Sequence, residues 1–377
     1  MGKAISPARA VAFEILLLVE RGGYAGDLLA SRAAGLDPRD AGLASEIALG
    51  SLRWQGELDF LIEHFAGRPA GRLDPEVRAA LRMGIYQLRH LDRVPPHAAV
   101  SESVELVKRA RKRSAAAMVN AVLRKVDRSP VVFPGRAIEL SHPAWLLERW
   151  ERQFGPEAAT AIARANLAPP KTYVRLRGIG LLACLPGETG REAYPTGRIQ
   201  DINSQAIVPL LELQPGLTFL DLCAAPGNKT AQALEAGVRA VACDIHLSRL
   251  KPLKTLGCDL VLLDGAVSLP FRRLFDRILA DVPCSGTGTL ARNPEIKWRL
   301  QPSNLIELHR LQVRLLRNAL QCLAPGGVLV YSTCSLEREE NEDVVEEALG
   351  RPPERIWRRT PGLDPGDGFF AAVIRSE

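Results

Sequence analysis

The first third of the chain, from Ser6 to about Arg128, repeats apolar residues at the spacing of amphipathic helices. Ser6-Pro7 and Asp74-Pro75 are helix-start signals, and Gly22-Gly23 is a stop signal. The apolar stripes that follow the two starts are Val11, Ile15, Leu18 and Val19, and Val77, Leu81, Ile85 and Leu88.

Further helices are expected from about Asp40 through Trp54 to His64, and on both sides of the basic segment 108–113. Residues 1–130 are therefore predicted to form an all-α domain of at least five helices. Residues 131–200 differ, because seven prolines interrupt most of the segment. One helix from about Ala144 to Asn166 and one strand within 171–177 are expected there, which indicates a connector with a small accessory layer.

Short apolar strands alternate with helical segments from about Thr218 to the end, a pattern typical of a mostly parallel α/β sheet. Residues 201–377 are therefore predicted to form an α/β Rossmann-like domain in a multidomain protein. The candidate strands are Thr218–Leu222, Ala240–Asp244, Leu260–Asp264, Arg277–Asp281, Gly327–Ser332 and Phe369–Arg375.

The 377 residues carry a net charge of +6, and most of the excess lies in residues 1–130, with 20 Lys+Arg against 15 Asp+Glu. This excess favours a polyanionic partner. The densest basic cluster is Lys108-Arg-Ala-Arg-Lys-Arg113, which is either a nucleic-acid contact or a solvated helix end. No apolar run is long enough to cross a bilayer, and no secretory signal is evident, so a cytoplasmic protein without a membrane partner is expected.

Seven cysteines occur without C-x-x-C spacing, and the six histidines form no i, i+4 pair. A disulfide framework and a metal site are therefore not expected. Most free cysteines are small buried hydrophobes, which is the interpretation for Cys184, Cys243, Cys258 and Cys322.

A glycine-bearing turn follows the first candidate strand in Asp221-Leu-Cys-Ala-Ala-Pro-Gly-Asn-Lys-Thr230. It matches neither a Walker loop nor G-x-G-x-x-G, and alone it could be a connector. The next two candidate strands, however, end at Asp244 and Asp264. Carboxylates at strand ends behind such a turn favour a bound adenosine, with Asp244 on the ribose hydroxyls and Asp264 near the adenine amino group.

Two cysteines also follow strands, in Asp281-Val-Pro-Cys-Ser-Gly-Thr-Gly288 and Tyr331-Ser-Thr-Cys-Ser335. Together with 221–230, these segments resemble the motifs of the RNA cytosine-C5 methyltransferases of the Nop2/Sun family. The resemblance extends through Asn293–Trp298, Glu339–Asn341 and Gly366–Phe370 and covers about half of the chain. The N-terminal domain resembles NusB, an RNA-binding antitermination factor, and this combination resembles the bacterial type that modifies 16S ribosomal RNA.

The resemblance implies S-adenosylmethionine as the methyl donor and 16S rRNA, naked or as an assembly intermediate, as the partner. The donor-binding residues that it implies are Cys223, Ala224, Ala225, Pro226, Gly227, Asn228, Lys229, Asp244, Asp264 and Asp281. Asn228 departs from the family pattern, which usually has a second glycine there. A monomer is expected.

Carbon 5 of cytosine is a weak nucleophile, so a thiolate must first add to carbon 6. The resemblance assigns this attack to Cys334, contact with the base edge near N3 to Asp281, and help in releasing the product to Cys284. Lys229 could act on the donor or on the base. Lys297-Trp-Arg299 offers either stacking and charge for RNA or a core tryptophan.

Three other functions remain open. A non-catalytic RNA-binding, assembly or antitermination factor has no need of Asp281, Cys284 and Cys334. A methyltransferase for another RNA, such as tRNA, would keep them. A nicotinamide-dependent oxidoreductase is disfavoured because G-x-G-x-x-G is missing.

Overall fold

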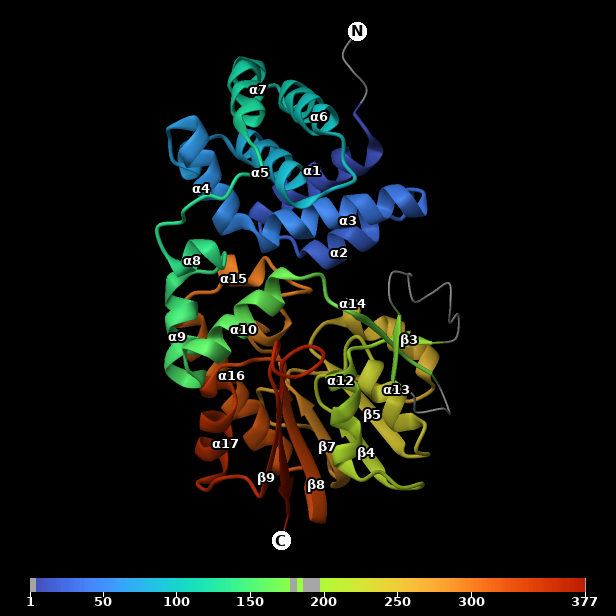
Figure 1. Ribbon diagram of the computed structural model, residues 1–377. Helices are drawn as coiled ribbons and strands as arrows, with labels where there is room; N and C mark the ends of the chain where they lie inside the picture. The colour runs from blue at the N-terminus through green and yellow to red at the C-terminus, as the bar shows by residue number, and fades with distance from the viewer. Residues whose placement is uncertain (1–4, 177–181, 186–196, 377) are drawn as a thin grey trace. The chain divides into compact units, whose positions relative to one another are not determined.

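The computed structural model describes residues 5–176 and 197–376, with residues 182–185 described as backbone only (Figure 1). The side chain of Cys184 and most of the expected accessory layer between 177 and 196 lie outside the described residues. The chain forms two compact units. The helical unit comprises Met1–Pro169 and Leu290–Arg299, and the sheet unit comprises Pro170–Thr289 and Leu300–Glu377.

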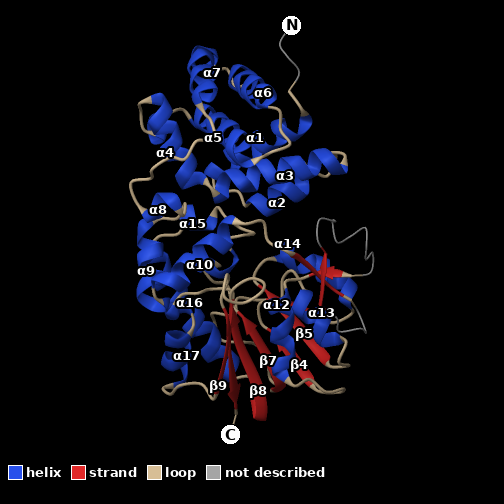
Figure 2. Ribbon diagram, viewed as in Figure 1, coloured by secondary structure: helices blue, strands red, loops and turns tan. Residues whose placement is uncertain are grey.

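The helical unit confirms the predicted all-α region (Figure 2). Its central helix is α5, where every residue from Ala79 to Gln87 is buried, so neighbouring helices enclose it on all sides. The helices are α1 (Pro7–Glu20), α2 (Ala25–Arg32), α3 (Pro38–Arg53), α4 (Gln55–Ala66), η1 (Ala70–Arg72), α5 (Pro75–His90), α6 (Pro96–Arg109), η2 (Arg113–Ala115), α7 (Ala116–Lys125), α8 (Arg136–Glu139), α9 (Ala144–Phe154), α10 (Pro156–Leu167) and α15 (Ile296–Arg299).

Two expected helices were wrong in length. The helix expected from about Asp40 to His64 is the pair α3 and α4, and the helix expected from about Ala144 to Asn166 is the pair α9 and α10. Trp54 ends α3 with φ −96° and ψ 12°, while its carbonyl accepts the first hydrogen bond of α4 from Leu58. Its indole lies 4.4 Å from the ring of His90, so a tertiary contact accompanies the break. The second break is at Gly155, whose φ of 87° is not helical, and Pro156 then begins α10.

The two units do not coincide with the three expected segments 1–130, 131–200 and 201–377. Helix α8 packs on α4, and α10 packs on α3, so residues 131–169 join the helical unit. The segment Leu290–Arg299, which is far along the chain, joins it as well. The three-domain division stays a prediction.

The sheet unit confirms the predicted mostly parallel α/β fold. Among the described residues its main sheet has seven strands in the order β6-β5-β4-β7-β8-β10-β9, of which only β10 runs antiparallel to its neighbours, β8 and β9. The strands are β4 (Thr218–Asp221), β5 (Arg239–Asp244), β6 (Asp259–Leu262), β7 (Phe275–Asp281), β8 (Leu323–Thr333), β9 (Arg355–Arg359) and β10 (Phe369–Arg375). The edge strand β9 was missed, since Arg-Ile-Trp-Arg-Arg has no apolar run.

A second small sheet has the order β2-β1-β3. Its β1 confirms the strand expected within 171–177. The strands are β1 (Thr172–Arg175), β2 (Leu182–Leu185) and β3 (Arg198–Ile199).

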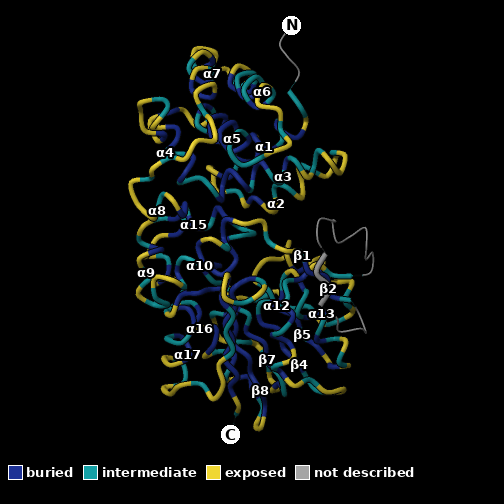
Figure 3. Tube along the Cα trace, viewed as in Figure 1, coloured by how far each residue is buried: buried dark blue, intermediate teal, exposed yellow. Residues whose placement is uncertain are grey.

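Helices cover both faces of the main sheet, because its inner strands are apolar on both sides. Figure 3 shows these strands as largely buried. Leu220, in β4, belongs to the core beneath α16 (Pro302–Leu320) and α17 (Glu342–Leu349). Phe219, its neighbour, belongs to the core beneath α12 (Ile202–Ile207), η3 (Val208–Leu211) and α13 (Asn228–Leu234). The remaining short helices are α14 (Leu247–Leu250), η4 (Lys251–Leu256), η5 (Thr287–Thr289) and η6 (Arg338–Glu340). The carboxyl ends of β4, β5, β6, β7 and β8 meet at one edge, where polar residues follow the strands.

Candidate active site in the sheet unit

The glycine turn joins β4 to α13 and is fixed to the neighbouring strand, since the Ala224 N–H donates to the Cys243 carbonyl at 2.7 Å. Gly227 has φ 95°, the left-handed region that favours glycine. A Cβ added there would lie 2.8 Å from the Leu253 side chain, so space also requires glycine. The side-chain amide of Asn228 donates to the Ile199 carbonyl at 3.3 Å, so this departure from the family pattern contacts β3.

Asp221 lies buried beneath this turn. The Thr230 hydroxyl donates to its Oδ2 at 2.6 Å, while Oδ1 has no hydrogen-bond partner among the described residues. Burial raises the pKa of Asp221 to about 7. Through its hydrogen bond with Thr230, the Asp221 carboxyl group connects the end of β4 to the first turn of α13.

A cavity of about 480 Å³ opens at the carboxyl edge of the sheet. Seven of the predicted site residues line it, and His246 and Arg249 line it as well, although the sequence analysis missed both. Their signal was their position directly after the strand end at Asp244. The predicted residues that line the cavity are Cys223, Ala225, Asp244, Asp264, Asp281, Cys284 and Cys334. The other predicted residues, Ala224, Pro226, Gly227, Asn228 and Lys229, build the turn beside it and are not part of its lining.

Asp244 and Asp264 are oriented by similar hydrogen bonds. Oδ1 of Asp244 accepts from the His246 N–H at 2.8 Å, and Oδ1 of Asp264 accepts from the Ala266 N–H at 2.9 Å. Each carboxylate is thus oriented by the turn that follows its strand while it lines the cavity. Such carboxylates can accept hydrogen bonds from hydroxyl and amino groups of a ligand.

The two motif cysteines meet although 50 residues separate them, since their Sγ atoms lie 3.4 Å apart. The hydrogen bond with Cys334 and, after it, burial raise the pKa of Cys284 well above its ordinary value. Cys284 is therefore a thiol at neutral pH and can donate to the sulfur of Cys334. Elsewhere Cys243 and Cys322 are buried and Cys258 is half-buried, and burial raises the pKa of Cys243 to about 12.

Asp281 ends β7 and receives two donors. Nζ of Lys229 donates to its Oδ2 at 2.5 Å, and the Ser332 hydroxyl donates to its Oδ1 at 2.7 Å. Burial lowers the pKa of Lys229, but the charge and hydrogen bond of Asp281, together with the charges of Cys334 and Asp221, outweigh burial and leave that pKa raised. The charge of Cys334 also raises the pKa of Lys229, so the ammonium places a positive field near that sulfur.

Glu340 is fully buried and connects the loop that carries Cys284 with the loop that carries Cys334. Its Oε1 accepts from the Ser285 N–H at 2.7 Å and from Gln312 at 3.0 Å, and its Oε2 accepts from the Ser335 hydroxyl at 2.5 Å. Sequence reasoning noted the segment 339–341 but gave Glu340 no role. The loops also meet at Gly288, where a Cβ would lie 2.8 Å from the Cys334 carbonyl oxygen.

The remaining predicted RNA-contact residues belong to the helical unit. Lys297 is buried and its Nζ donates to the Arg53 carbonyl at 2.8 Å. In the basic cluster, Lys108 pairs with Glu105 at 2.7 Å and Lys112 with Asp74 at 3.0 Å.

Within the described part of the chain, no group of three or more His, Cys, Asp or Glu side chains is arranged to hold a metal ion. The same residues contain no helix with the length and apolar character needed to span a bilayer.

Comparisons with known proteins agree with the fold. The family model for the 16S rRNA methyltransferase RsmB/F matches residues 208–367, and the NusB family model matches residues 6–128. The ribosomal RNA small subunit methyltransferase B of Cronobacter sakazakii is 32% identical, over 99% of this chain and 99% of that protein.

Among solved structures, the crystal structure of PH0851 matches with a TM-score of 0.81 and 21% identity over 100% of both chains, a likeness that shows the fold. A methyltransferase homolog protein from Pyrococcus horikoshii matches with a TM-score of 0.55 and 26% identity, over 64% of this chain and 97% of that one. With its helical NusB region, its mostly parallel sheet and relatives matched from end to end, the chain belongs to the RsmB/F family of 16S rRNA methyltransferases.

Proposed function

We propose that this protein transfers a methyl group from S-adenosylmethionine to carbon 5 of a cytosine in 16S ribosomal RNA. The observation that carries this proposal is the pair of cysteine sulfurs, 3.4 Å apart, that lines a cavity together with three strand-end aspartates. One cysteine suffices for a nucleophile, and a second beside it suits a reaction that must also release its covalent product. The relative from Cronobacter sakazakii, named for small-subunit rRNA, supports the choice of RNA.

The residues present fit the donor. Its ribose hydroxyls would donate to Asp244, and its adenine amino group would donate to Asp264. Cys223 and Ala225 line the same cavity, whose volume of about 480 Å³ is in the range of cofactor sites. When bound, the sulfonium group of S-adenosylmethionine supplies an electrophilic methyl group.

Cys334 begins the reaction as a thiolate. Its sulfur forms a bond to carbon 6 of the cytosine, and the electron pair of the carbon 5–carbon 6 double bond moves to carbon 5, which takes the methyl group. The Lys229 ammonium places positive charge near this sulfur, and the Cys284 thiol can donate a hydrogen bond to it.

Asp281 faces the base edge in this proposal. Lys229 and Ser332 hold its carboxylate from both sides, so it is pre-oriented to stabilise a cytosine that is protonated on N3 while carbon 6 is attacked. Elimination follows: carbon 5 gives its proton to water, the bond between carbon 6 and the Cys334 sulfur breaks with its electron pair returning to that sulfur, and the aromatic ring is restored. The Cys284 thiol assists by donating a hydrogen bond to the departing Cys334 thiolate. Because carbon 6 is stacked inside a duplex, the base must be unpaired or flipped out.

The direct test is methyl transfer from labelled S-adenosylmethionine to deproteinised 16S rRNA, followed by nucleoside mass spectrometry. We expect 5-methylcytidine with the native protein and none with Cys334→Ser. Cys284→Ala should accumulate a protein–RNA adduct that is stable to denaturing electrophoresis. A parallel reaction with tRNA identifies the RNA class, and product on tRNA alone, or a methylated position other than carbon 5, would overturn the proposal.

A further inference from the structure

The helical unit contains a second cavity, of about 430 Å³, and all of its lining residues belong to that unit. The walls come from α1, α3, α4, η1 and α5, and the segment Leu290–Arg299 contributes three residues. The proposed methyl-transfer reaction uses none of them. The residues that matter for its chemistry are Glu20, Asp59, Arg78, Arg82, Glu295 and Trp298.

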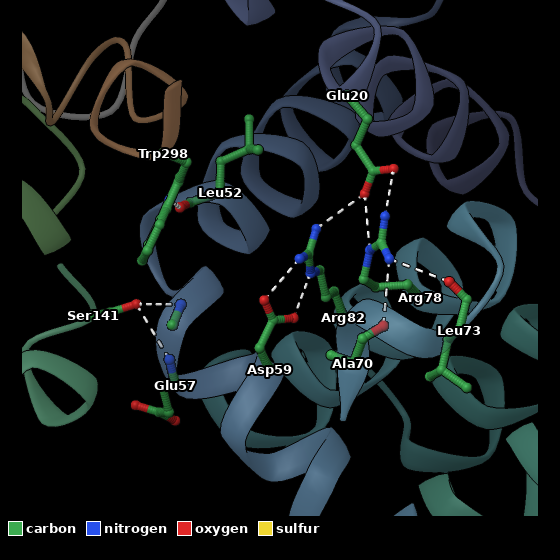
Figure 4. Close-up of polar contacts among 11 residues, drawn as sticks. Glu20, Leu52, Glu57, Asp59, Ala70, Leu73, Arg78, Arg82, Ser141 and Trp298 are labelled. Carbon is green, nitrogen blue, oxygen red and sulfur yellow. Dashed lines mark hydrogen bonds and ion pairs between the residues drawn. The ribbon is translucent and has the colours of Figure 1, made fainter. Parts of the chain in front are cut away.

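Two arginines of this cavity, Arg78 and Arg82, are paired with acidic side chains (Figure 4). Arg82 donates to both oxygens of Asp59 at 2.7 Å and to Glu20 at 3.2 Å. Arg78 donates to Glu20 at 3.0 and 3.2 Å and to the carbonyls of Ala70 and Leu73. Acidic side chains neutralise this cation pair, so the cavity suits an uncharged ligand better than an anion.

Glu295 supplies a hydrogen-bond acceptor that no donor among the described residues satisfies. Its side chain is 1% exposed, and its Oε1 accepts from the Ala25 N–H at 3.0 Å. Its Oε2 is buried and has no hydrogen-bond partner among the described residues. An unpaired buried carboxylate oxygen is unfavourable, and an N–H donor on a ligand would satisfy it.

Trp298 supplies a flat wall. Its indole N–H donates to the Leu52 carbonyl at 2.8 Å, which fixes the ring, and the side chain remains half-buried at the edge of the cavity. Figure 4 shows the indole opposite the Arg82–Asp59 pair, with Leu52 beside it. A fixed indole at a cavity wall is suited to stack with a planar ligand.

We propose that this cavity binds one unpaired nucleobase of the RNA substrate, stacked on Trp298 and donating an N–H to Oε2 of Glu295. A nucleobase is planar and uncharged and carries N–H donors, which are the three properties that the walls select. The inference rests on the proposed function for the identity of the polymer. It adds a contact outside the cavity that holds the two cysteines, made by a segment that follows the Cys284 loop directly.

Two variants test the cavity in the full-length protein without removing a structural contact. Glu295→Gln keeps an oxygen for the Ala25 N–H and replaces the unpaired acceptor by an amide N–H. Gly71→Leu places a side chain at the cavity wall, where an added Cβ meets nothing within 4 Å, so folding should be unaffected. Glu63→Gln, an exposed site in the same unit, is the control with the same charge change as Glu295→Gln.

The readouts are filter binding of transcribed 16S rRNA and ultraviolet cross-linking, with cross-linked peptides located by mass spectrometry. We expect a cross-link at Trp298 in the native protein, its loss in both cavity variants, and RNA binding about tenfold weaker in each, while the control stays native. Thermal melting verifies that each variant is folded. Native affinity and an intact pattern of cross-links in both cavity variants would overturn the inference. Because neither readout requires methyl transfer, its failure is distinct from failure of the proposed function, which 5-methylcytidine formation reports.

Discussion

At the scale of single residues, Cys284 and Cys334 share one hydrogen bond but have different surroundings. The pKa of Cys284 is raised by its contact with Cys334 and by burial, whereas Cys334 lies within the field of the Lys229 ammonium. A thiol that stays protonated and a sulfur near a cation suit the two steps of the proposed reaction, elimination and attack. The structure thus supports the division of roles that the family resemblance implies.

Lys229 has two tasks in this account, because it orients Asp281 and supplies positive charge near Cys334. Removing one pre-oriented donor from an active site typically lowers kcat by about 10²- to 10³-fold. We therefore expect Lys229→Met to lower the rate of methyl transfer by about 10²-fold, with the affinity for S-adenosylmethionine changed by no more than a few-fold. Single-turnover kinetics and calorimetry measure the two quantities. Lys254→Met, at an exposed lysine, is the matched control, and a variant that loses donor binding instead would contradict this role.

Asp221 links pH to stability. Its pKa is about 7 in the folded protein and about 4 in an unfolded chain, so the folded state holds the extra proton between these values. Its contribution to stability is therefore fully present below about pH 4 and is lost as the pH rises through 7. The free energy of unfolding of the native protein should therefore fall between pH 4 and pH 8 by on the order of 2 to 4 kcal/mol more than that of Asp221→Asn, which has no titrating group at this position. Urea unfolding at both pH values tests this, and parallel pH profiles of the two proteins would contradict it.

Much of the site could be predicted at this scale, since strand-end positions and motif spacing located Asp244, Asp264, Asp281 and both cysteines. Their partners could not. Glu340 contacts Ser285, which lies 55 residues away, and no local pattern records a hydrogen bond of that separation. Asn228 shows a different limit, because sequence shows that the residue is unusual but not that its amide contacts β3.

At the scale of elements, the close approach of α3 and α5 depends on Gly50. A Cβ at this position would lie 2.0 Å from the ring of Tyr86, whose hydroxyl donates to Glu46 at 2.5 Å. We expect Gly50→Ala to destabilise the helical unit by about 1–3 kcal/mol, because the helices must move apart.

Gly42→Ala in the same helix is the control, since nothing lies within 4 Å of its added Cβ. It should stabilise the unit by about 0.5–1 kcal/mol through helix propensity. Chemical denaturation followed by circular dichroism compares the two variants. Equal midpoints would show that α3 and α5 do not depend on this close approach.

Most elements were predictable because their apolar periods are strong, as in α5, β7 and β8. The breaks within helices were harder. The break at Gly155 had a local signal in Gly-Pro, whereas Trp54 is a residue that helices tolerate, and its break coincides with contacts that form only in the folded unit. The edge strand β9 is defined by pairing with β10 rather than by its own composition.

At the scale of the whole molecule, the chain enters the helical unit twice, first in Met1–Pro169 and again in Leu290–Arg299. The predicted division placed the second segment within residues 201–377. Its actual partners are far away in sequence: Lys297 contacts Arg53, Trp298 contacts Leu52, and Arg299 contacts Gly23. Domain assignment by chain order could not reveal this exchange.

The positive charge of the helical unit leads to a prediction for RNA binding. Within the basic cluster, Arg111 and Arg113 are exposed, whereas Lys108 and Lys112 have acidic partners. Replacing both arginines by Gln should weaken binding to 16S rRNA and lower the slope of log K against log salt by roughly one or two. Arg39→Gln with Arg68→Gln is the control for net charge, because both residues are exposed in the same unit. Equal slopes in the two double variants would identify the cluster as a solvated helix end.

The central claim is that Cys334 forms a covalent bond to the base that is methylated. It is tested most directly with 16S rRNA transcribed with 5-fluorocytidine, because the fluorine on carbon 5 blocks elimination after methyl transfer. Mass spectrometry of the denatured complex then identifies the residue that carries the base. The account predicts a methylated adduct on Cys334 that forms only when S-adenosylmethionine is present and is lost in Cys334→Ser. An adduct on Cys284, or turnover of unmodified RNA by Cys334→Ser, would contradict it.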